Sequence, residues 1–244
     1  MVEKLISIVT VSFNAASTIE KTIKSVGKHK SSRTEYIIID GGSKDGTVDL
    51  IKKHSDGVDK WVSEPDKGIY DAMNKGVALA SGEWILFLGA DDLLCLNISE
   101  IEDNLTRDFT YYGNVELLSN SKIYDGKFGR YKILMRNICQ QAIFYPVRLL
   151  RERRFNQKYK IAADYEMNLF LYGTQPLKLK YIDKVVSIFD DTGVSSKIND
   201  KVFRSDFIWL FFRYFPLYFY PMYFIALLNY YVLRTIFYVN KSIG

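Results

Sequence analysis

Cysteine is scarce in this sequence of 244 residues, which contains only Cys95 and Cys139. The two stand far apart and do not form the CxxC spacing of a paired site. A structural disulfide is therefore the less favoured interpretation, and reduced thiols fit a cytosolic setting. A hydrophobic leader is also lacking, because polar Ser12 and Asn14 follow the first short apolar run. We therefore expect the main domain to stay inside the cell.

A strong excess of charge is lacking as well. The formal net charge of +5 permits acidic partners, such as nucleotide phosphates or an anionic membrane surface, without requiring them. We expect no nucleic-acid partner. The sequence has no internal repeat and no low-complexity linker. Its length and its hydrophobic fraction of 48% favour one globular domain, residues 1–204, followed by an appendage, residues 205–244.

Short apolar runs of strand length alternate with helical segments in the first part of the chain. The sequence predicts strands at 5–13, 36–39, 60–62 and 83–88, and helices at about 18–26, 48–54 and 69–80. Such alternation is typical of a parallel sheet of nucleotide-binding type. Beyond Asp92 the pattern changes, and it predicts strands at 109–118, 122–124 and 178–189 with a helix at 161–172.

Two adjacent carboxylates follow the last of the early strands. The run from Glu83 to Leu88 is mostly apolar, Gly89 breaks it, and Asp91 and Asp92 come directly afterwards. Ligands of open α/β sheets lie outside the carboxyl ends of the strands. Two acids at that edge repel each other unless a cation or hydrogen-bond donors compensate them, and a divalent metal that holds a diphosphate would do so. The alternative is an ordinary acidic turn.

Five segments occur in a fixed order along the chain: ISIVTVSFN, IIIDGGSKDGT, SEPDKGIYDAMNKG, FLGADD and IAADYE. Together they resemble the family-2 glycosyltransferases of the GT-A fold, most closely the bacterial branch that builds O-antigen and other surface polysaccharides. The resemblance covers roughly residues 5–195, and its specificity lies in the order and spacing of the segments. It implies an α/β fold with a mostly parallel central sheet flanked by helices, followed here by an aromatic helical appendage.

The resemblance also implies an activity. It is the inverting transfer of a hexosyl or N-acetylhexosaminyl group from a nucleotide-diphosphate sugar, with UDP as the favoured nucleotide and Mg²⁺ or Mn²⁺ as cofactor. The implied acceptor is a saccharide linked to a polyprenyl diphosphate. The alternative is a non-catalytic nucleotide-sugar-binding subunit of a polysaccharide-assembly complex. A Rossmann dehydrogenase is excluded because GGSKDG lacks the GxGxxG spacing and follows the second strand.

The resemblance assigns the nucleotide to the ends of the first two strands. The acid that matches Asp40 binds the nucleotide base, and the segment that includes Thr10 and Ser12 lies against the base and ribose. Two glycines after Asp40 would let backbone approach a ligand there. The structural alternatives are a turn cap for Asp40, a turn or helix-start role for Asp45, and a buried strand for Thr10 and Ser12.

Asp71, Asn74 and Lys75 are spaced three and four residues apart, so they share one face of the predicted helix. The resemblance places this face, which Glu64 and Asp66 precede, near the donor sugar and diphosphate. The alternative is a solvated polar face. Among the acids after the fourth strand, Asp91 is the expected metal ligand.

Asp92 is expected to support that metal ligand or bind the ribose. Gly89 stands where the family usually has the first acid of its Asp-x-Asp element. This is a departure from the family pattern.

Asp164 matches the catalytic base of the family, with helix capping as its structural alternative and Glu166 as the runner-up for the role. Gln140 and Gln141 are candidates for the acceptor site. The segment 193–195 resembles one that closes over the diphosphate.

The segment 206–240 is aromatic and apolar, and it contains no charge from Tyr214 to Leu233. Pro216, Pro221 and many tyrosines argue against a simple membrane span, and we favour interfacial helices that attach the protein peripherally to the cytoplasmic leaflet. A span or hairpin, a homodimer surface and core packing are the alternatives. An arginine cluster would add attraction to anionic lipid or a lipid diphosphate, or form a solvated face: Arg148, Arg151, Arg153 and Arg154.

Overall fold

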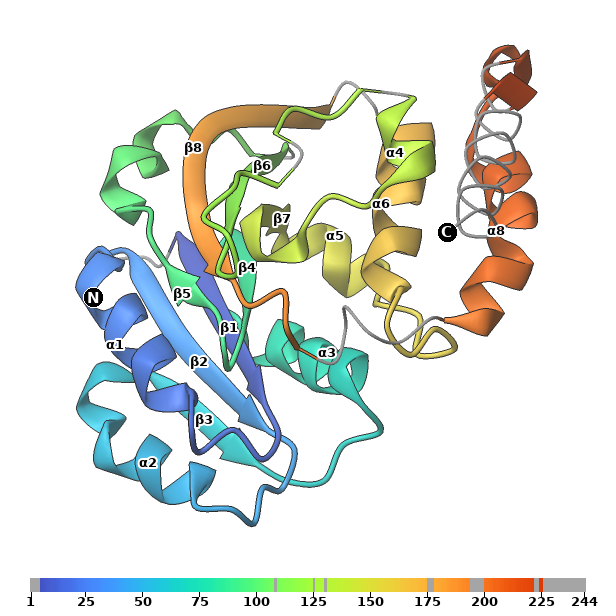
Figure 1. Ribbon diagram of the computed structural model, residues 1–244. Coiled ribbons are helices and arrows are strands. Elements are labelled where there is room, and N and C mark those ends of the chain that lie inside the picture. The colour runs from blue at the N-terminus through green and yellow to red at the C-terminus, as the bar shows by residue number, and fades with distance from the viewer. Residues whose placement is uncertain are drawn as a thin grey trace, which may run out of the picture.

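The computed structural model describes residues 5–107, 109–124, 126–129, 131–174, 178–193, 200–221 and 224–225 (Figure 1). Its strands form one sheet in the order β3-β2-β1-β4-β7-β6-β8-β5. The strands are β1 (Ile6–Ser12), β2 (Thr34–Asp40), β3 (Lys60–Ser63), β4 (Trp84–Gly89), β5 (Leu93–Leu94), β6 (Thr110–Leu117), β7 (Ile143–Pro146) and β8 (Leu179–Phe189). The sheet agrees with the predicted α/β class.

Helices cover both faces of this sheet (Figure 1). They are α1 (Ile19–His29), α2 (Thr47–Lys53), α3 (Ile69–Leu79), α4 (Lys132–Met135), α5 (Val147–Glu152), α6 (Ala163–Thr174) and α8 (Lys201–Tyr214). Short 3-10 helices lie at Ser55–Gly57, Ile98–Glu100, Glu102–Asn104, Gln140–Ala142 and Leu217–Phe219. The apolar side of α1, with Ile19 and Ile23, joins the buried cluster on one face, whereas Met73 and Val77 of α3 join the cluster on the other.

The first half of the sheet is parallel, as the alternation of strands and helices predicts. Strand β1 pairs with β2 and β4, and β2 pairs with β3. In this register Ser12 lies opposite Asp40, and Val11 lies opposite Gly89. Both β1 and β2 are buried along their whole length, as apolar runs on two faces indicate. Polar residues that follow β1, β2 and β4 therefore meet at one edge of the sheet.

The second half is mixed and curls back toward the first. Strand β7 is antiparallel to β4 and β6, β8 is parallel to β6, and the short β5 is antiparallel to β8. Because β5 follows Asp92 within the same loop, its pairing brings the end of β8 to the end of β4. The backbone N–H of Asp190 accordingly donates to Asp92 Oδ1 at 3.2 Å.

The predicted strands at 109–118 and 178–189 are confirmed as β6 and β8. The predicted strand at 122–124 is reduced to one isolated bridge, Glu116 to Ile123. The sequence did not predict β5, β7 and α5. These elements have two, four and six residues, too few to show a period.

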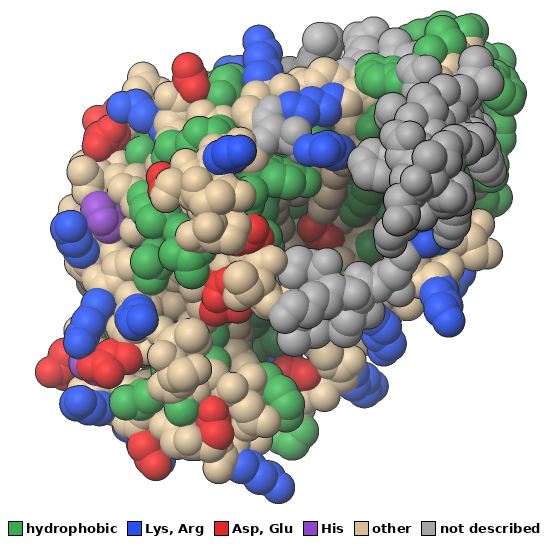
Figure 2. Space-filling model, viewed as in Figure 1, with side chains coloured by type: hydrophobic (Ala, Val, Ile, Leu, Met, Phe, Trp, Pro, Cys, Tyr) green, Lys and Arg blue, Asp and Glu red, His purple; other side chains and the backbone are tan. Residues whose placement is uncertain are grey.

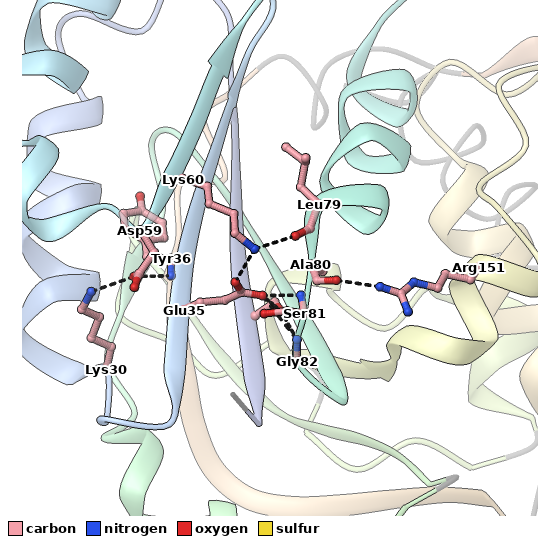
Figure 3. A network of polar contacts seen from close by, with 11 residues as sticks. Lys30, Glu35, Tyr36, Asp59, Lys60, Leu79, Ala80, Ser81, Gly82 and Arg151 are labelled. Atoms are coloured by element: carbon pink, nitrogen blue, oxygen red, sulfur yellow. Dashed lines mark hydrogen bonds and ion pairs between the residues drawn. The ribbon is translucent and has the colours of Figure 1, made fainter. Parts of the chain in front are cut away.

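A buried carboxylate joins the parallel strands at the edge opposite the candidate site (Figure 3). Glu35 of β2 accepts hydrogen bonds from the Ser7 hydroxyl and from the backbone N–H groups of Ser81 and Gly82, and it pairs with Lys60 Nζ at 2.9 Å. Burial would raise the pKa of Glu35, but these hydrogen bonds, first that of Ser7, outweigh burial and lower it. The network fixes β1, β2, β3 and the loop before β4 relative to one another.

Two cationic side chains cap the C-terminal end of α3 (Figure 3). Lys60 Nζ donates to the Leu79 carbonyl at 3.0 Å, and Arg151 Nη2 donates to the Ala80 carbonyl at 2.7 Å. Carbonyls at a helix end lack partners within the helix, and positive charge there is favourable. Arg151 thus anchors α3, whose other end lies at the candidate site.

The aromatic segment begins with α8, which packs against α6. The proposed boundary at residue 204 falls inside this helix, and one side of α8 and the next turn belongs to the core: Phe203, Leu210, Phe211, Tyr214, Phe215 and Phe219. Among the described residues no helix combines the length and apolar character needed to cross a bilayer. Residues 226–244 lie outside the described residues.

Candidate active site

Asp40 ends β2 and has no exposed surface. Its carboxylate accepts hydrogen bonds from the backbone N–H groups of Gly42 and Ser43 at 3.1 and 2.9 Å, and from the hydroxyls of Ser12 and Ser63 at 3.1 and 2.7 Å. The Ser43 hydroxyl adds a further bond at 2.5 Å. Burial would raise the pKa of Asp40, but the bonds from Ser43 and Ser63 outweigh it and lower the pKa. Asp40 thus holds an ionised charge and organises the loop around it.

Thr10 and Ser12 differ although both belong to β1. Ser12 reaches Asp40, as the predicted nucleotide site requires. Thr10 is fully buried, and its hydroxyl accepts from Tyr36 Oη at 3.0 Å. The structure therefore places the Thr10 side chain in the core, which is the structural alternative for this residue.

An exposed aromatic side chain that the motifs did not single out lies beside this loop. Phe13 is 65% exposed and follows β1 directly. A Cβ built on Gly41 would lie 3.2 Å from Phe13 Cδ2 and 2.5 Å from Asp66 Oδ2. Only glycine at position 41 lets Asp66 come this close. The sequence could have indicated Phe13 by its position directly after a buried strand. An exposed ring at that position does not pack in the core and is available to a ligand.

Asp45 connects the two loops that border this region. Its carboxylate accepts from the backbone N–H of Ala16 at 2.9 Å and from that of Thr47 at 3.1 Å. The Thr47 hydroxyl in turn accepts from the Ala15 N–H at 2.8 Å. These contacts show that Asp45 stabilises the turn at the start of α2, which is the structural alternative given for this residue.

The polar residues of α3 fix neighbouring segments. Asn74 is buried, and its amide exchanges two 3.0 Å hydrogen bonds with the backbone of Phe155. Asp71 Oδ2 accepts from the Lys67 N–H at 3.0 Å. The oxygen and the nitrogen of the Asn74 amide therefore both make hydrogen bonds inside the fold.

Lys75 lies near Asp71 on the same face, at 4.0 Å, as the helical spacing predicts. Its Nζ donates to the Pro65 carbonyl at 2.9 Å and pairs with Glu64 at 2.8 Å. Lys75 thereby fastens the loop that precedes α3.

The acids after β4 lie in different surroundings. Asp91 is exposed, whereas Asp92 has no exposed surface and accepts from the Gly89 N–H at 2.7 Å. Burial and the nearby charge of Asp91 raise the pKa of Asp92 to about 7. Partial desolvation of the Asp91 carboxyl, with the negative charge of Asp190 as a further cause, raises the pKa of Asp91. Among the described residues no cationic side chain pairs with the carboxylates at this edge, so hydrogen-bond donors alone compensate their charge.

Gly89, where the family pattern has an acid, lies close to both of the following carboxylates. A Cβ at this position would lie 2.6 Å from Asp91 Oδ1 and 2.8 Å from Asp92 Oδ2, so a larger residue would displace both carboxylates. A Cβ on Gly193 would lie 3.3 Å from Asp91 Oδ2. The segment 193–195 therefore reaches Asp91 with its first residue, and the remaining two lie outside the described residues.

The residues present fit a metal that takes few protein ligands. Within the part of the chain that the structure describes, no group of three or more His, Cys, Asp or Glu side chains could hold an ion. Mg²⁺ and similar cations bind through one or two carboxylates, and substrate phosphates and water complete the shell. Asp91 beside Asp190 matches that donor set. A cation there would also offset the charges of Asp190 and Asp91, which contribute to the raised pKa values of Asp91 and Asp92.

Asp164, the second residue of α6, is held by two donors. The Tyr70 hydroxyl donates to Oδ1 and the Asn137 amide to Oδ2, each at 2.6 Å. The amide of Asn168 donates to Asn137 Oδ1 at 2.8 Å, so Asn137 is itself held in place. Burial raises the pKa of Asp164 even though the bonds from Tyr70 and Asn137 oppose this. A base with a raised pKa is a stronger proton acceptor once ionised.

Glu166 faces a different part of the molecule. It is buried, it pairs with Arg153, and it accepts from the Tyr214 hydroxyl of α8. Two residues along a helix point to nearly opposite sides. The geometry therefore favours Asp164 over Glu166 as the base.

A short irregular segment, Asn137–Gln141, links the two groups of acids. Asn137 binds Asp164, and the Gln141 side chain makes a hydrogen bond to Asp92 that lowers the pKa of that residue. Burial raises the pKa of the Cys139 thiol, and the charges of Asp92 and Asp164 raise it further. Both carboxylates therefore act on one segment. Nothing in the sequence indicated the role of Asn137, because the segment has no regular pattern.

Comparison with known proteins points to one family. The model for glycosyl transferase family 2 matches residues 7–95. A PGL/p-HBAD biosynthesis glycosyltransferase of Mycobacterium bovis (strain BCG / Pasteur 1173P2) is 32% identical over 215 residues, which cover 83% of this chain and 84% of that protein. A UDP-Glc:alpha-D-GlcNAc-diphosphoundecaprenol beta-1,3-glucosyltransferase of Escherichia coli is 35% identical over 132 residues, 52% of each chain.

A solved structure shares the fold. Glucosyl-3-phosphoglycerate synthase from Mycobacterium tuberculosis, in complex with Mn²⁺, UDP and glucosyl-3-phosphoglycerate, matches with a TM-score of 0.59 and 16% identity. The match covers 80% of this chain and 75% of that one. At this identity the likeness shows the fold alone.

Proposed function

This chain belongs to glycosyltransferase family 2, and from that premise we propose that it catalyses inverting sugar transfer from a UDP-sugar to a lipid-linked saccharide. The observation that carries this proposal is the segment Asn137–Gln141, which contacts Asp92 at the nucleotide edge and Asp164 at the start of α6. A donor diphosphate at Asp92 and an acceptor hydroxyl at Asp164 would then lie next to the same segment, Asn137–Gln141.

The reaction requires one displacement. The acceptor oxygen attacks the anomeric carbon from the face opposite the diphosphate, the bond from that carbon to the diphosphate oxygen breaks, and the configuration inverts. Asp164 takes the acceptor proton onto its carboxylate, which Tyr70 and Asn137 keep in position. The donors on Asp164 also limit the rise in its pKa, so that the base is available in ionised form.

Residues at the strand ends would bind the donor. In this proposal Asp40 and Ser12 lie at the base and ribose, with Phe13 as a stacking surface for the base. Asp71, Asn74 and Lys75 support the sugar side, Asn74 through the backbone of Phe155. Asp91 would hold Mg²⁺ or Mn²⁺ and Asp92 would support it. A bound cation supplies positive charge that stabilises the departing diphosphate.

The acceptor assignment rests on the relatives and on the aromatic segment. The Escherichia coli relative is named for an acceptor that is a diphosphoundecaprenol-linked sugar. An acceptor of that kind lies in a membrane, and α8 exposes large apolar side chains, among them Ile208, Trp209 and Phe212. We propose peripheral attachment at the cytoplasmic membrane surface for this reason.

The test is Asp164→Asn, with Asp56→Asn as the matched control at an exposed site. Asp164→Asn should lower transfer by roughly 10²–10⁴-fold, the usual contribution of a general base, and leave UDP binding nearly intact. The assay is metal-dependent release of UDP in the presence of polyprenyl-diphosphate saccharides. Robust turnover by Asp164→Asn removes Asp164 from this role. Donor binding without turnover by the unmodified protein would favour the non-catalytic subunit instead.

A further inference from the structure

A cavity lies between α6 and α8, and Glu166, which faces away from the Asp164 side of α6, is among its lining residues. Its volume is about 220 Å³, and the side chains that line it include Arg153, Arg154, Glu166, Trp209, Arg213 and Tyr214. One ordered water requires roughly 10–15 Å³ of such space. The cavity therefore has room for a polar group larger than a few waters.

Within the described part of the chain, two buried polar atoms on its lining residues have no hydrogen-bond partner. They are Arg153 Nε, a donor, and Glu166 Oε2, an acceptor. The Glu166 side chain is only 3% exposed, and its other oxygen accepts from Arg153 and from the Tyr214 hydroxyl. Leaving such atoms without partners is costly. A ligand that satisfies both must accept a hydrogen bond from the arginine and donate one to the carboxylate.

The charge of the cavity favours an anion. Three guanidinium groups line it against one carboxylate. Arg213 lies over the ring of Trp209, 4.8 Å from its centroid, and no acidic partner pairs with Arg154 or Arg213 among the described residues. Guanidinium groups bind phosphate oxygens with charge-assisted hydrogen bonds. A phosphate ester that also carries a free hydroxyl meets both requirements.

The surface beside the cavity identifies the source of that phosphate. Exposed apolar side chains of α8 and the following turn include Ile208, Phe212, Leu217 and Tyr218. Ile208 and Phe212 directly precede the lining residues Trp209 and Arg213 in the chain, and Figure 2 shows hydrophobic side chains gathered at the end of the molecule that carries α8. A soluble metabolite would not require such a surface. Apolar side chains next to arginines are typical of a protein that rests on a membrane and contacts its headgroups.

We propose that the cavity between α6 and α8 binds the headgroup of an anionic phospholipid with hydroxyl groups, of the glycerol type. The lipid phosphate accepts hydrogen bonds from the arginines, including Arg153 Nε, and a headgroup hydroxyl donates to Glu166 Oε2. The acyl chains lie along the exposed side of α8. This site is separate from the sugar-transfer site, and it does not depend on the proposed reaction.

The first test compares lipids. The full chain is mixed with phosphatidylcholine vesicles that contain an equal share of phosphatidylglycerol or of phosphatidylethanol, which carries the same charge without a hydroxyl. We expect stronger binding to phosphatidylglycerol, measured by vesicle flotation, because only its headgroup donates to Glu166. Equal binding to both anionic lipids overturns the proposal.

The second test compares two arginine variants of equal charge. Arg213→Gln should weaken binding to phosphatidylglycerol vesicles by about tenfold, the effect of losing one charge-assisted hydrogen bond. Arg148→Gln is the matched control, because Arg148 is exposed on α5, pairs with Glu152 at 2.9 Å and does not line the cavity. Equal losses in both variants would assign binding to surface charge and overturn the site.

The last experiment distinguishes a lipid ligand from a soluble phosphate ester by competition. Soluble glycerol 3-phosphate should compete with vesicles only at high concentration, because it lacks acyl chains. Saturable binding of glycerol 3-phosphate without binding to any vesicle overturns the lipid assignment. UDP binding should be unchanged in Arg213→Gln, which confirms folding. A failure of UDP binding in the unmodified chain would count against the sugar-transfer proposal and not against this one.

Discussion

The buried acids on β2 differ in their pKa values from the acids at the end of β4 and at the start of α6. Glu35 and Asp40 accept several hydrogen bonds each, and these bonds lower their pKa values despite burial. Asp91, Asp92 and Asp164 have raised pKa values because desolvation outweighs their fewer donors, and neighbouring carboxylates add to the rise for Asp91 and Asp92. The first group therefore stabilises the fold, whereas under the proposed function the second group offers negative charge to a cation or a proton.

The difference follows from where each group lies. Glu35 and Asp40 are on a strand in the middle of the parallel half, where backbone N–H groups of adjacent loops and serine hydroxyls, most of them on neighbouring strands, surround them. The second group lies where the curled half of the sheet returns to the first, and there carboxylates meet carboxylates. Repulsion of this kind destabilises a fold, and perturbed carboxylates of this kind are typical of functional sites.

The largest expected effect is on activity, from Asp91→Asn. We expect metal-dependent transfer to fall by at least roughly 100-fold, because changes in residues that only support a metal ligand already cost ~10–100-fold. Without metal and donor, the stability of this variant should be unchanged or higher, since repulsion with Asp190 and Asp92 is relieved. Asp40→Asn should behave differently and lower the melting temperature. If Asp91→Asn lowers stability as much as Asp40→Asn does, the contrast between the two groups is wrong.

The second effect concerns stability, from Glu35→Gln. The change removes the carboxylate that pairs with Lys60. It also presents a neutral amide group to the N–H groups of Ser81 and Gly82. Breaking a buried ion pair typically costs about 3–5 kcal/mol, and we expect the lower end because Lys60 is 42% exposed. Denaturant unfolding at neutral pH measures it. Glu152→Gln, which removes an exposed carboxylate, should change the free energy of unfolding by less than about 0.5 kcal/mol.

Acid titration of stability checks the same residue independently. The pKa of Glu35 is lowered from its ordinary value of 4.5, so its stabilising effect is present above that pH and is lost as the pH falls through the lowered value. Glu35→Gln should therefore lose less stability than the unmodified protein below pH 4.5. Parallel curves for the two proteins would contradict the assignment.

The sequence predicted one of these regions better than the other. Strands β1, β2 and β4 and helix α3 follow from local apolar runs and turn residues, and their parallel register places Ser12 beside Asp40. The contacts of Asn137 and Asp190 could not be predicted, because they depend on how the second half of the sheet curls. An apolar, aromatic run also looks the same whether it covers a core or a membrane, and α8 does present one side to the core.

The smallest effect is a shift of the pH profile in Tyr70→Phe. The Tyr70 hydroxyl lowers the pKa of Asp164, so its removal should raise that pKa further. The acidic limb of kcat/KM then moves to higher pH, because a base must be ionised to accept a proton. We expect a loss of a few-fold at neutral pH and a recovered rate at high pH. Tyr218→Phe, at a residue that is 68% exposed, is the control and should leave the profile unchanged. A uniform loss of rate at every pH would show that Tyr70 positions the helix and does not tune Asp164, and the raised pKa of that carboxylate would then have no part in the reaction.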